Sequence, residues 1–246
     1  MEWRASKGTL VELHVGNDDA RIVEAASRVE KLGIDCPFGW PIEFVEFVAN
    51  HSADAATAPD VDGGMDWRRQ LSFRETDRAV REITGRWPLS VSTDRLGLTA
   101  MRCAGLLARL TASGISVDRA GSGVVVEVYP GATIRMWGFD TAGYRTSSDA
   151  RARLLDLLCE SAPWFDAGLF APLMLSSCDA FDAVIAAMAS RSAARGSYTK
   201  PSAAQLDRAR REGWIALPTG SLSDVAVDTQ EGQVKSSHDV VEVDED

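Results

Sequence analysis

The sequence predicts a mixed α/β fold with helices flanking a sheet, and two observations predict it. Short runs rich in β-branched residues alternate with longer stretches whose apolar residues recur at helical spacing. One complete strand–helix–strand step falls within residues 9–35. Alternation of this kind is typical of one α/β domain. We place that domain at residues 1–218, because no change of composition marks a boundary near the middle of the chain.

The first predicted elements lie in the N-terminal part. Residues 9–15 alternate polar and apolar side chains, which predicts a half-buried strand with Val11 and Val15 on its buried face. Asn17 or Asp18 can cap the helix that follows. The apolar residues of this helix recur every three or four positions, so one of its faces can pack on the sheet.

The later elements continue the alternation. Residues 123–129 are nearly all β-branched, as expected of a strand that is buried on both faces of a parallel sheet. The other elements predicted after the first helix are a strand over 32–35, a helix over 94–114, helices over 149–160 and 177–195, and a last element over 213–218.

Charge is distributed unevenly along the 246 residues. The formal net charge is −10, but the last 28 residues hold eight of the 36 acidic residues and only one of the 26 basic ones. The net charge of residues 1–218 is therefore only −3. We predict that residues 219–246 form a disordered acidic tail, which could engage a basic partner. The rest of the chain lacks the strongly basic balance of a protein that coats nucleic acid.

Several classes of protein are excluded by what the sequence lacks. No apolar run approaches the roughly 18 residues of a membrane span, and the N-terminus has no signal-peptide core, so we expect a cytoplasmic protein without a membrane segment. The four cysteines are scattered, which argues against a disulfide scaffold or a zinc module. There is no P-loop, no GxGxxG after a strand and no GxSxG elbow, and the three histidines lie far apart. Chemistry by carboxylates and a metal ion remains.

Two carboxylates stand out by their place at predicted strands. Asp35 ends the second strand, and ligands of open α/β sheets bind at the carboxyl ends of strands. The alternative is a turn aspartate that caps the bend at Pro37. Glu127 interrupts a strand that otherwise reads as buried, where a carboxylate is costly unless it is paired, hydrogen-bonded or bound to a metal ion. The alternative is a strand whose second face is partly exposed.

Two further aspartates share one face of the predicted helix over 177–195. Asp179 and Asp182 are three residues apart, which brings them to the same side. Asp179 could simply stabilise the start of the helix. Asp182 opens a run of Ala, Val, Ile and Met that must pack inward, so the two like charges favour a counter-charge such as a divalent cation.

Arg74 and Arg78 belong to an arginine-rich segment with Trp67 and Trp87 nearby. Arginines interleaved with aromatic residues can hold phosphates and stack on bases. The alternative is a solvated helix face with local ion pairs.

Four motifs occur in the order in which one known family carries them. They are GIDCPFGWP at 33–41, RETD at 74–77, EVYP at 127–130 and DAFDA at 179–183. Over roughly residues 9–218 the sequence resembles the domain of unknown function numbered 429, a family described as predicted nucleases of the RNase H fold. Tyr144, Arg145 and the segment 213–218 are also similar to that family.

The resemblance implies an RNase H-like mixed sheet flanked by helices, with acidic residues gathered at its centre. In the wider superfamily, which includes the RuvC resolvases, such carboxylates hold two Mg²⁺ or Mn²⁺ ions that activate water and stabilise the leaving oxygen. Carried over by motif, the metal ligands are Asp35, Asp179 and Asp182. The implied catalytic residues are Asp35, Glu127 and Asp182. The implied substrate-binding residues are Arg74, Asp77, Arg78, Tyr129 and Tyr144.

The sequence departs from this family at its start. The family begins with a strand ending in Gly-Val-Asp or Gly-Ile-Asp, whose aspartate is the central metal ligand, and nothing before Thr9 has that form. Residues 2–4 resemble the end of the second strand, so we expect the first strand to be missing. The leading prediction is a metal-dependent nuclease acting on DNA or RNA. The alternatives are an inactive binding module and a kinase-like enzyme for a small phosphorylated substrate.

Overall fold

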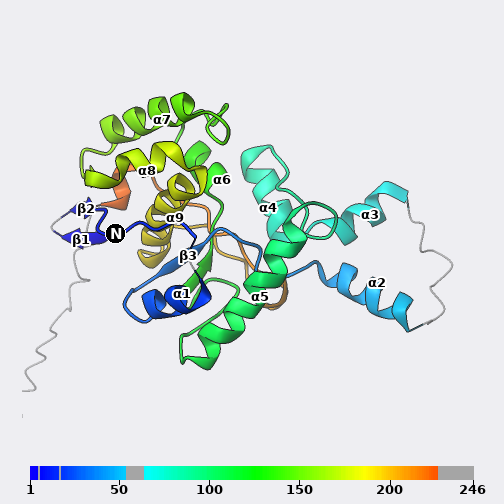
Figure 1. Cartoon of the computed structure of the whole chain (residues 1–246). Helices are drawn as coiled ribbons and strands as arrows, with labels where there is room; N and C mark the ends of the chain where they lie inside the picture. The colour runs from blue at the N-terminus through cyan, green and yellow to red at the C-terminus, as the bar shows by residue number, and fades with distance from the viewer. Residues whose placement is uncertain (5, 17, 54–63, 227–246) are drawn as a thin grey trace, which may run out of the picture.

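The computed structural model describes residues 1–4, 6–16, 18–53 and 64–226. Within these ranges the chain forms ten α-helices, two 3-10 helices and five short strands, so the predicted mixed α/β class is confirmed (Figure 1). In chain order the elements are β1 (Glu2–Arg4), β2 (Lys7–Thr9), α1 (Asp19–Ala26), β3 (Leu32–Ile34), α2 (Ile42–Ser52), α3 (Gly64–Ser72), α4 (Glu75–Thr84), α5 (Leu96–Ala112), β4 (Val125–Glu127), α6 (Pro130–Met136), α7 (Ser148–Ser161), β5 (Phe165–Asp166), η1 (Gly168–Phe170), α8 (Ala171–Ser176), α9 (Cys178–Ala194), α10 (Leu206–Glu212) and η2 (Ser223–Val225).

The strands form two small sheets in the part of the chain that the structure describes. In one sheet the middle strand is β2, which pairs antiparallel with β1 and parallel with β5. The other sheet is the parallel pair of β3 and β4, in which Leu32 faces Val125 and Ile34 faces Glu127. An isolated parallel bridge between Glu127 and Ile215 places the segment after α10 beside β4. The RNase H-like strand order and the missing first strand remain predictions.

β4 is buried on both faces, as its β-branched residues predict. Val125 packs in a cluster with residues of α1 and α5, among them Ala26 and Leu110. Val126 packs on the opposite face, in a cluster with Ala186 of α9. This alternation follows from the two-residue period of a strand. Helices therefore cover both faces of the β3–β4 pair, with α9 on one side and α1 and α5 on the other (Figure 1).

α9 approaches the strands closely because a glycine faces it. A Cβ atom at Gly33 of β3 would lie 2.7 Å from the carbonyl oxygen of Ala186 and 3.2 Å from the Cβ of Ser190. A larger residue at this position would therefore push the strand and the helix apart. On its other side α9 packs on α6 and α8, where Phe181 and Ile185 enter a large apolar cluster. α9 is thus the central helix of the fold.

The first predicted strand differs from the structure. The strand expected over residues 9–15 is wrong, because β2 ends at the first of them, and Val11 and Val15 are exposed. The Leu10 N–H still donates to the carbonyl oxygen of Asp166. β5 is only two residues long, so it cannot extend the pairing. A local alternation of side chains does not make a strand where no partner strand runs beside it.

The structured chain continues beyond residue 218. Leu222 and Val225 are buried in the same apolar cluster as Phe181, and the Asp224 carboxylate accepts the Ser221 N–H at 2.7 Å. The predicted tail therefore begins too early, because two apolar residues anchor the turn of η2 despite the acidic composition around them. Residues 227–246 of the predicted tail lie outside the described residues.

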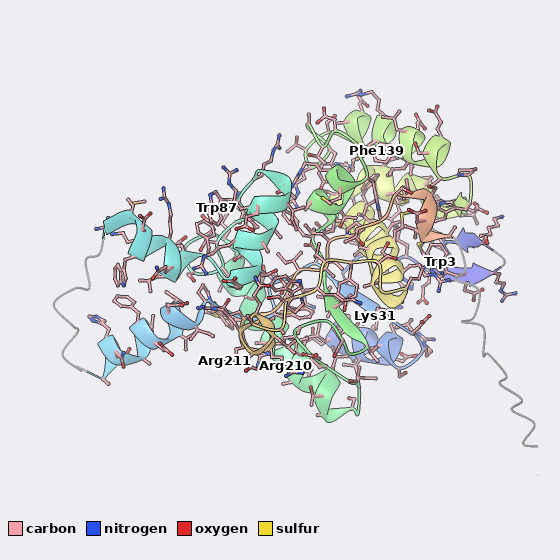
Figure 2. All side chains as sticks on the ribbon, turned by 180° about the vertical axis from the view of Figure 1, so that it is seen from behind. Trp3, Lys31, Trp87, Phe139, Arg210 and Arg211 are labelled. Atoms are coloured by element: carbon pink, nitrogen blue, oxygen red, sulfur yellow. The ribbon has the colours of Figure 1, made fainter. Side chains whose placement is uncertain are left out.

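Aromatic contacts mark two opposite sides of the molecule. On one side, α2 and α3 pack on each other through Phe47 and Trp67, whose ring centroids are 5.7 Å apart. On the other side, Trp3 of β1 packs against Trp164 with ring centroids 5.2 Å apart (Figure 2). Among the helices of the described ranges, none combines the length and the apolar character needed to cross a bilayer.

Candidate functional site

The structure divides the predicted site residues between two places, of which the first is a buried ionic network. The buried ionic network consists of Arg74, Asp77 and Glu127, whose exposed fractions are 2%, 0% and 2%. Arg74 occupies the N-cap position of α4, Asp77 lies in the first turn of that helix, and Glu127 ends β4. The network therefore joins the start of a helix to the end of a central strand.

All three guanidinium nitrogens of Arg74 donate to protein oxygens. Nη1 donates to Glu127 Oε2 at 3.0 Å and to the carbonyl oxygen of Glu212 at 3.1 Å. Nη2 donates to Glu127 Oε1 at 2.8 Å and to Asp77 Oδ1 at 3.0 Å, and Nε donates to Asp77 Oδ2 at 3.2 Å. Burial opposes the charge on Arg74, but the Asp77 and Glu127 carboxylates outweigh burial and hold its pKa above its ordinary value. The planar fork of arginine suits this arrangement.

Backbone groups complete the buried ionic network. Asp77 Oδ2 accepts the backbone N–H of Arg74 at 2.9 Å, and Glu127 Oε2 accepts the backbone N–H of Phe38 at 3.0 Å. Gly213 packs directly on the network. Its φ is +91°, and a Cβ atom added at this position would lie only 2.5 Å from Glu127 Oε2. Because Phe38 lies in the loop after β3, Glu127 holds this loop against the end of β4.

These contacts change the roles expected for three residues. Arg74 and Asp77 were candidates for substrate binding, but their charged groups are buried and satisfy each other. Glu127 was a candidate catalytic residue, but its carboxylate is held by Arg74 and Phe38. The carboxylate in the buried strand does have the partner that it requires, and that partner lies 53 residues away in the sequence. The structure gives all three residues a structural role.

A third buried acid, Glu212, was not predicted from the sequence. It is fully buried, and one carboxylate serves the starts of two helices. Oε1 accepts the N–H of Ile42 in α2 at 2.9 Å, and Oε2 accepts the N–H of Glu75 in α4 at 2.7 Å. Arg208 Nε donates to Oε1 at 3.0 Å. A glutamate at the end of a short helix carries no local signal of such distant partners.

The second place is the carboxylate site, made of Asp35, Asp179, Asp182, Tyr144 and Arg145. Its residues come from three separate segments. The first aspartate follows β3, the tyrosine and arginine lie between α6 and α7, and the other two aspartates lie near the start of α9. The charges of Asp179 and Asp182 both act on Asp35, so the three aspartates that the resemblance marked as metal ligands lie in the same region of the fold.

Asp182 is buried yet only partly satisfied. Its Oδ2 lies 3.7 Å from Arg145 Nη2 and accepts a weak hydrogen bond from the Cys178 thiol at 3.7 Å. Its Oδ1 has no hydrogen-bond partner within the described chain. Burial raises the pKa of this carboxyl, and Arg145 and the hydroxyl of buried Tyr144 oppose the rise. A buried carboxylate oxygen without a partner is unfavourable and is a feature of binding sites.

Asp35 has a strongly raised pKa. Its side chain reaches solvent but is closely surrounded by protein, and this desolvation raises its pKa to about 7. The charge of Asp182 acts in the same direction, as do the charges of Glu127 and Asp179, whereas Arg145 opposes them. A carboxyl that titrates near neutrality beside like charges is typical of functional sites.

Two predicted substrate-binding residues belong to neither group. Arg78 is half-buried on α4 and pairs with Glu75 at 3.2 Å. Tyr129 is half-buried at the N-cap of α6, where Arg135 lies over its ring at 5.7 Å. Their roles in substrate binding stay predictions.

The carboxylate site supplies some of the ligands that one hard cation needs, and it is not a complete cage of protein ligands. No group of three or more His, Cys, Asp or Glu side chains in the described ranges is arranged to hold a metal ion. Mg²⁺, however, is commonly held by one or two carboxylates, with water and substrate phosphate as its other ligands. The unpartnered Oδ1 of Asp182 and the neighbouring Asp35 supply this kind of donor set.

Fold and site together define a mixed α/β protein with a carboxylate site where β3 ends beside the start of α9. The sequence model of the protein of unknown function DUF429 matches residues 2–205, and the chain belongs to this family. No curated protein and no solved structure matches the chain.

Replacing Arg74 by leucine should destabilise the fold strongly. The change leaves Asp77 and Glu127 buried without their cation, and breaking a buried pair in this way costs about 3–5 kcal/mol. Arg78→Leu is the matched control, because its more exposed pair with Glu75 contributes about 0–1 kcal/mol. Urea unfolding of both variants measures the difference. Equal free energies of unfolding would show that the buried ionic network does not hold the fold together.

Replacing Gly213 by alanine should destabilise the protein more than the same change at Gly138. Both glycines have positive φ, at +91° and +89°, so both substitutions carry backbone strain of about 1–2 kcal/mol. Only at Gly213 does the new Cβ meet Glu127 and Phe38, which adds about 1–3 kcal/mol of overpacking. Denaturant unfolding distinguishes the two, and a cost at Gly138 as large as at Gly213 would contradict the close packing.

Replacing Asp35 by asparagine should stabilise the protein in a pH-dependent way. Its carboxyl binds a proton more tightly in the folded state, with a pKa near 7, than in the unfolded chain, with a pKa near 4. The charged carboxylate therefore destabilises the fold increasingly from about pH 4 to pH 7, and fully above that. The melting temperature of Asp35→Asn should exceed that of the wild type above pH 7, and the gap should close towards pH 4. The exposed Asp66→Asn change is the control, and a gap independent of pH would refute the raised pKa.

Proposed function

We propose that this protein is a divalent-metal-dependent phosphodiesterase that acts on nucleic acid, with Asp35 and Asp182 as ligands of Mg²⁺ or Mn²⁺. The observation that carries the proposal is that these two carboxylates lie near enough for the charge of Asp182 to act on Asp35. One has a pKa near 7 and the other a buried oxygen without a partner. Both features are energetically unfavourable while no cation is bound, and a cation bound between the two carboxylates would relieve them.

The residues of the carboxylate site divide the chemistry among them. A bound divalent ion would polarise the phosphodiester and ease the deprotonation of water. Asp182 Oδ1 is a ligand held in place, because Arg145 and Cys178 contact the other oxygen of the same carboxylate. Asp35 is the second ligand, and because its pKa is about 7 without a cation, binding of a cation near neutral pH displaces a proton from it.

Arg145 is placed to contact a phosphate. Its side chain is 55% exposed, and only one end of it lies near Asp182. The Tyr144 hydroxyl accepts from Arg145 Nε at 3.4 Å, which fixes the orientation of the guanidinium. Phosphate oxygens are strong acceptors for such a fork. Buried Tyr144 therefore orients Arg145 and does not itself meet the substrate.

A basic and aromatic hollow supports nucleic acid as the substrate. The hollow has a volume of about 280 Å³, and Trp40, Arg119, Arg210 and Arg211 are among its lining residues. Figure 2 shows Arg210 and Arg211 next to each other. Trp40 lies five residues after Asp35 in the chain, in the loop that the buried ionic network holds. An aromatic ring beside arginines is the combination that binds unpaired bases and their phosphates.

The basic partner of the tail and the cytoplasmic location stay predictions.

One observation favours the alternative of an inactive binding module. Arg145 already lies 3.7 Å from Asp182 and supplies a positive charge where a metal ion would otherwise be needed. In such a module the guanidinium would be the permanent counter-charge. Metal binding separates the two proposals, because only the enzyme requires it.

Cleavage of branched DNA, single-stranded DNA and structured RNA with Mn²⁺ or Mg²⁺ tests the proposal. Asp182→Asn should lose activity by about 100-fold or more, since even the loss of a group that merely supports a metal ligand costs about 10–100-fold. The fold of this variant should persist, because the change removes a poorly satisfied buried charge. Asp66→Asn, at an exposed carboxylate of α3, should cleave like the wild type. No cleavage of any substrate by the wild type, together with no metal binding, would overturn the proposal.

A further inference from the structure

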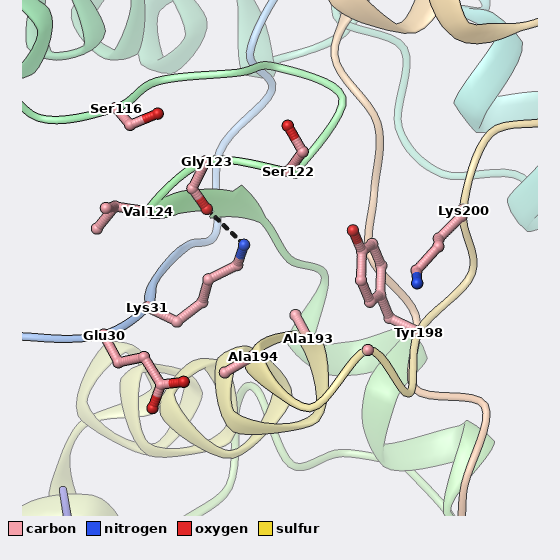
Figure 3. A pocket seen from close by; sticks show the side chains of 11 residues that line it. Glu30, Lys31, Ser116, Ser122, Gly123, Val124, Ala193, Ala194, Tyr198 and Lys200 are labelled. Carbon is pink, nitrogen blue, oxygen red and sulfur yellow. Dashed lines mark hydrogen bonds between the residues drawn. The ribbon is translucent and has the colours of Figure 1, made fainter. Parts of the chain in front are cut away.

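A cavity of about 530 Å³ opens at the amino ends of β3 and β4 (Figure 3). It lies at the opposite end of these strands from the carboxylate site, because Lys31 precedes β3 and Val124 precedes β4, whereas Asp35 follows β3. The volume is within the range of small-molecule sites, about 300–1,000 Å³. The lining comprises Glu30, Lys31, Ser116, Ser122, Gly123, Val124, Ala193, Ala194, Gly196, Tyr198 and Lys200.

One wall of the cavity carries an ammonium group in a fixed position. Lys31 Nζ donates to the carbonyl oxygens of Gly121 at 2.8 Å and Gly123 at 2.5 Å. Desolvation lowers the pKa of Lys31, while the charges of Asp118 and Glu30 oppose this. An ammonium has three N–H donors, so one remains for a ligand. The lysine is thus positioned by the protein without being neutralised by a direct ion pair.

The other wall carries a second ammonium group and a phenol. Lys200 Nζ lies 5.2 Å from the centre of the Tyr198 ring, and the Tyr198 hydroxyl is 3.4 Å from the carbonyl oxygen of Gly121. Figure 3 shows the Tyr198 hydroxyl between the ends of Lys31 and Lys200. Only four lysines occur in the whole sequence, and two of them line this one cavity.

The nearby acids do not neutralise these lysines. Glu30 Oε2 lies 3.7 Å from Arg191 Nη1, and Asp118 accepts from the Ala120 N–H and the Ser122 hydroxyl. Within the described ranges, neither lysine has a carboxylate within ion-pair distance. The carbonyls at the end of α9 would repel an anion, but the N–H groups of residues 195–197 cap that end. Two lysines and one acid, Glu30, line the cavity, so its lining carries a net positive charge.

We propose that this cavity binds a small phosphorylated molecule through its phosphate monoester group. Lys31 and Lys200 would contact the phosphate oxygens from opposite walls, and Ser122 adds a hydroxyl to the rim. Two point charges from different directions suit a compact dianion with several oxygens better than a planar carboxylate. The organic part would rest on the apolar side chains of Val124 and Ala193 and on the Tyr198 ring. The site is separate from the proposed nuclease site and does not depend on that function.

Titration of the full-length protein with inorganic phosphate and phenyl phosphate, followed by amide NMR in the presence of EDTA, tests the proposal. Both probes should bind saturably and shift the amides of Ser122 and Gly123, and acetate and benzoate should bind more weakly. Lys200→Gln should weaken phosphate binding by about tenfold or more, as expected for the loss of a charged hydrogen bond. This lysine is exposed, so the variant should fold normally.

Two controls make the outcome specific. Lys7→Gln makes the same change at an exposed lysine of β2 and should leave phosphate affinity unchanged. Asp66→Asn, at an exposed carboxylate of α3, should also leave it unchanged, which excludes a general effect of surface charge. Equal affinity of wild type and Lys200→Gln would overturn the proposal, as would carboxylates that bind as tightly as phosphates.

Discussion

The structure depends on the buried guanidinium of Arg74, which is held between Asp77 and Glu127. Arg74 joins the start of α4 to the end of β4, and Glu127 extends the connection to Phe38 in the loop after β3. Such a network is not strongly stabilising by itself, because removing three charges from water offsets much of their attraction. Its effect is geometric: only one arrangement of strand, helix and loop satisfies every charge. That arrangement determines where the chain emerges after β3, and therefore where Asp35 lies.

The contrast between the two groups of acids separates structure from function. Glu127 is buried and fully satisfied, whereas Asp182 is buried with one oxygen that has no partner. Glu43 Oε2 also lacks a partner, so the incomplete carboxylate of Asp182 points to function only together with its neighbour Asp35. Asp35 repeats the pattern, since its pKa of about 7 reflects desolvation together with the charge of Asp182. A carboxyl with a raised pKa beside a carboxylate oxygen without a partner is typical of functional sites.

Periodicity in the sequence predicted the helices and the strand that pack on other elements along a defined face. It failed where no such element lies alongside, or where the partner is far away in the sequence. β4 and the long helices α5, α7 and α9 lie close to the ranges expected, because burial on defined faces imposes a period on the sequence. The sequence indicated that Glu127, if buried, would need a partner, but not that Arg74 would provide it, since that pairing exists only in the folded chain. Glu212 left no signal for the same reason. Motif resemblance brought Asp35 and Asp182 together, which spacing alone could not do.

A carboxyl-resolved NMR titration of Asp35, in the wild type and in Asp182→Asn, shows whether these two carboxylates share one site. We expect a pKa of about 7 for Asp35 in the wild type and a lower pKa in the variant, because the charge of Asp182 contributes to the rise. Addition of Mg²⁺ should lower the pKa of Asp35 in the wild type more than in the variant. An Asp35 that titrates near 4 in both proteins, with no response to Mg²⁺, would show that the two carboxylates do not form a common site.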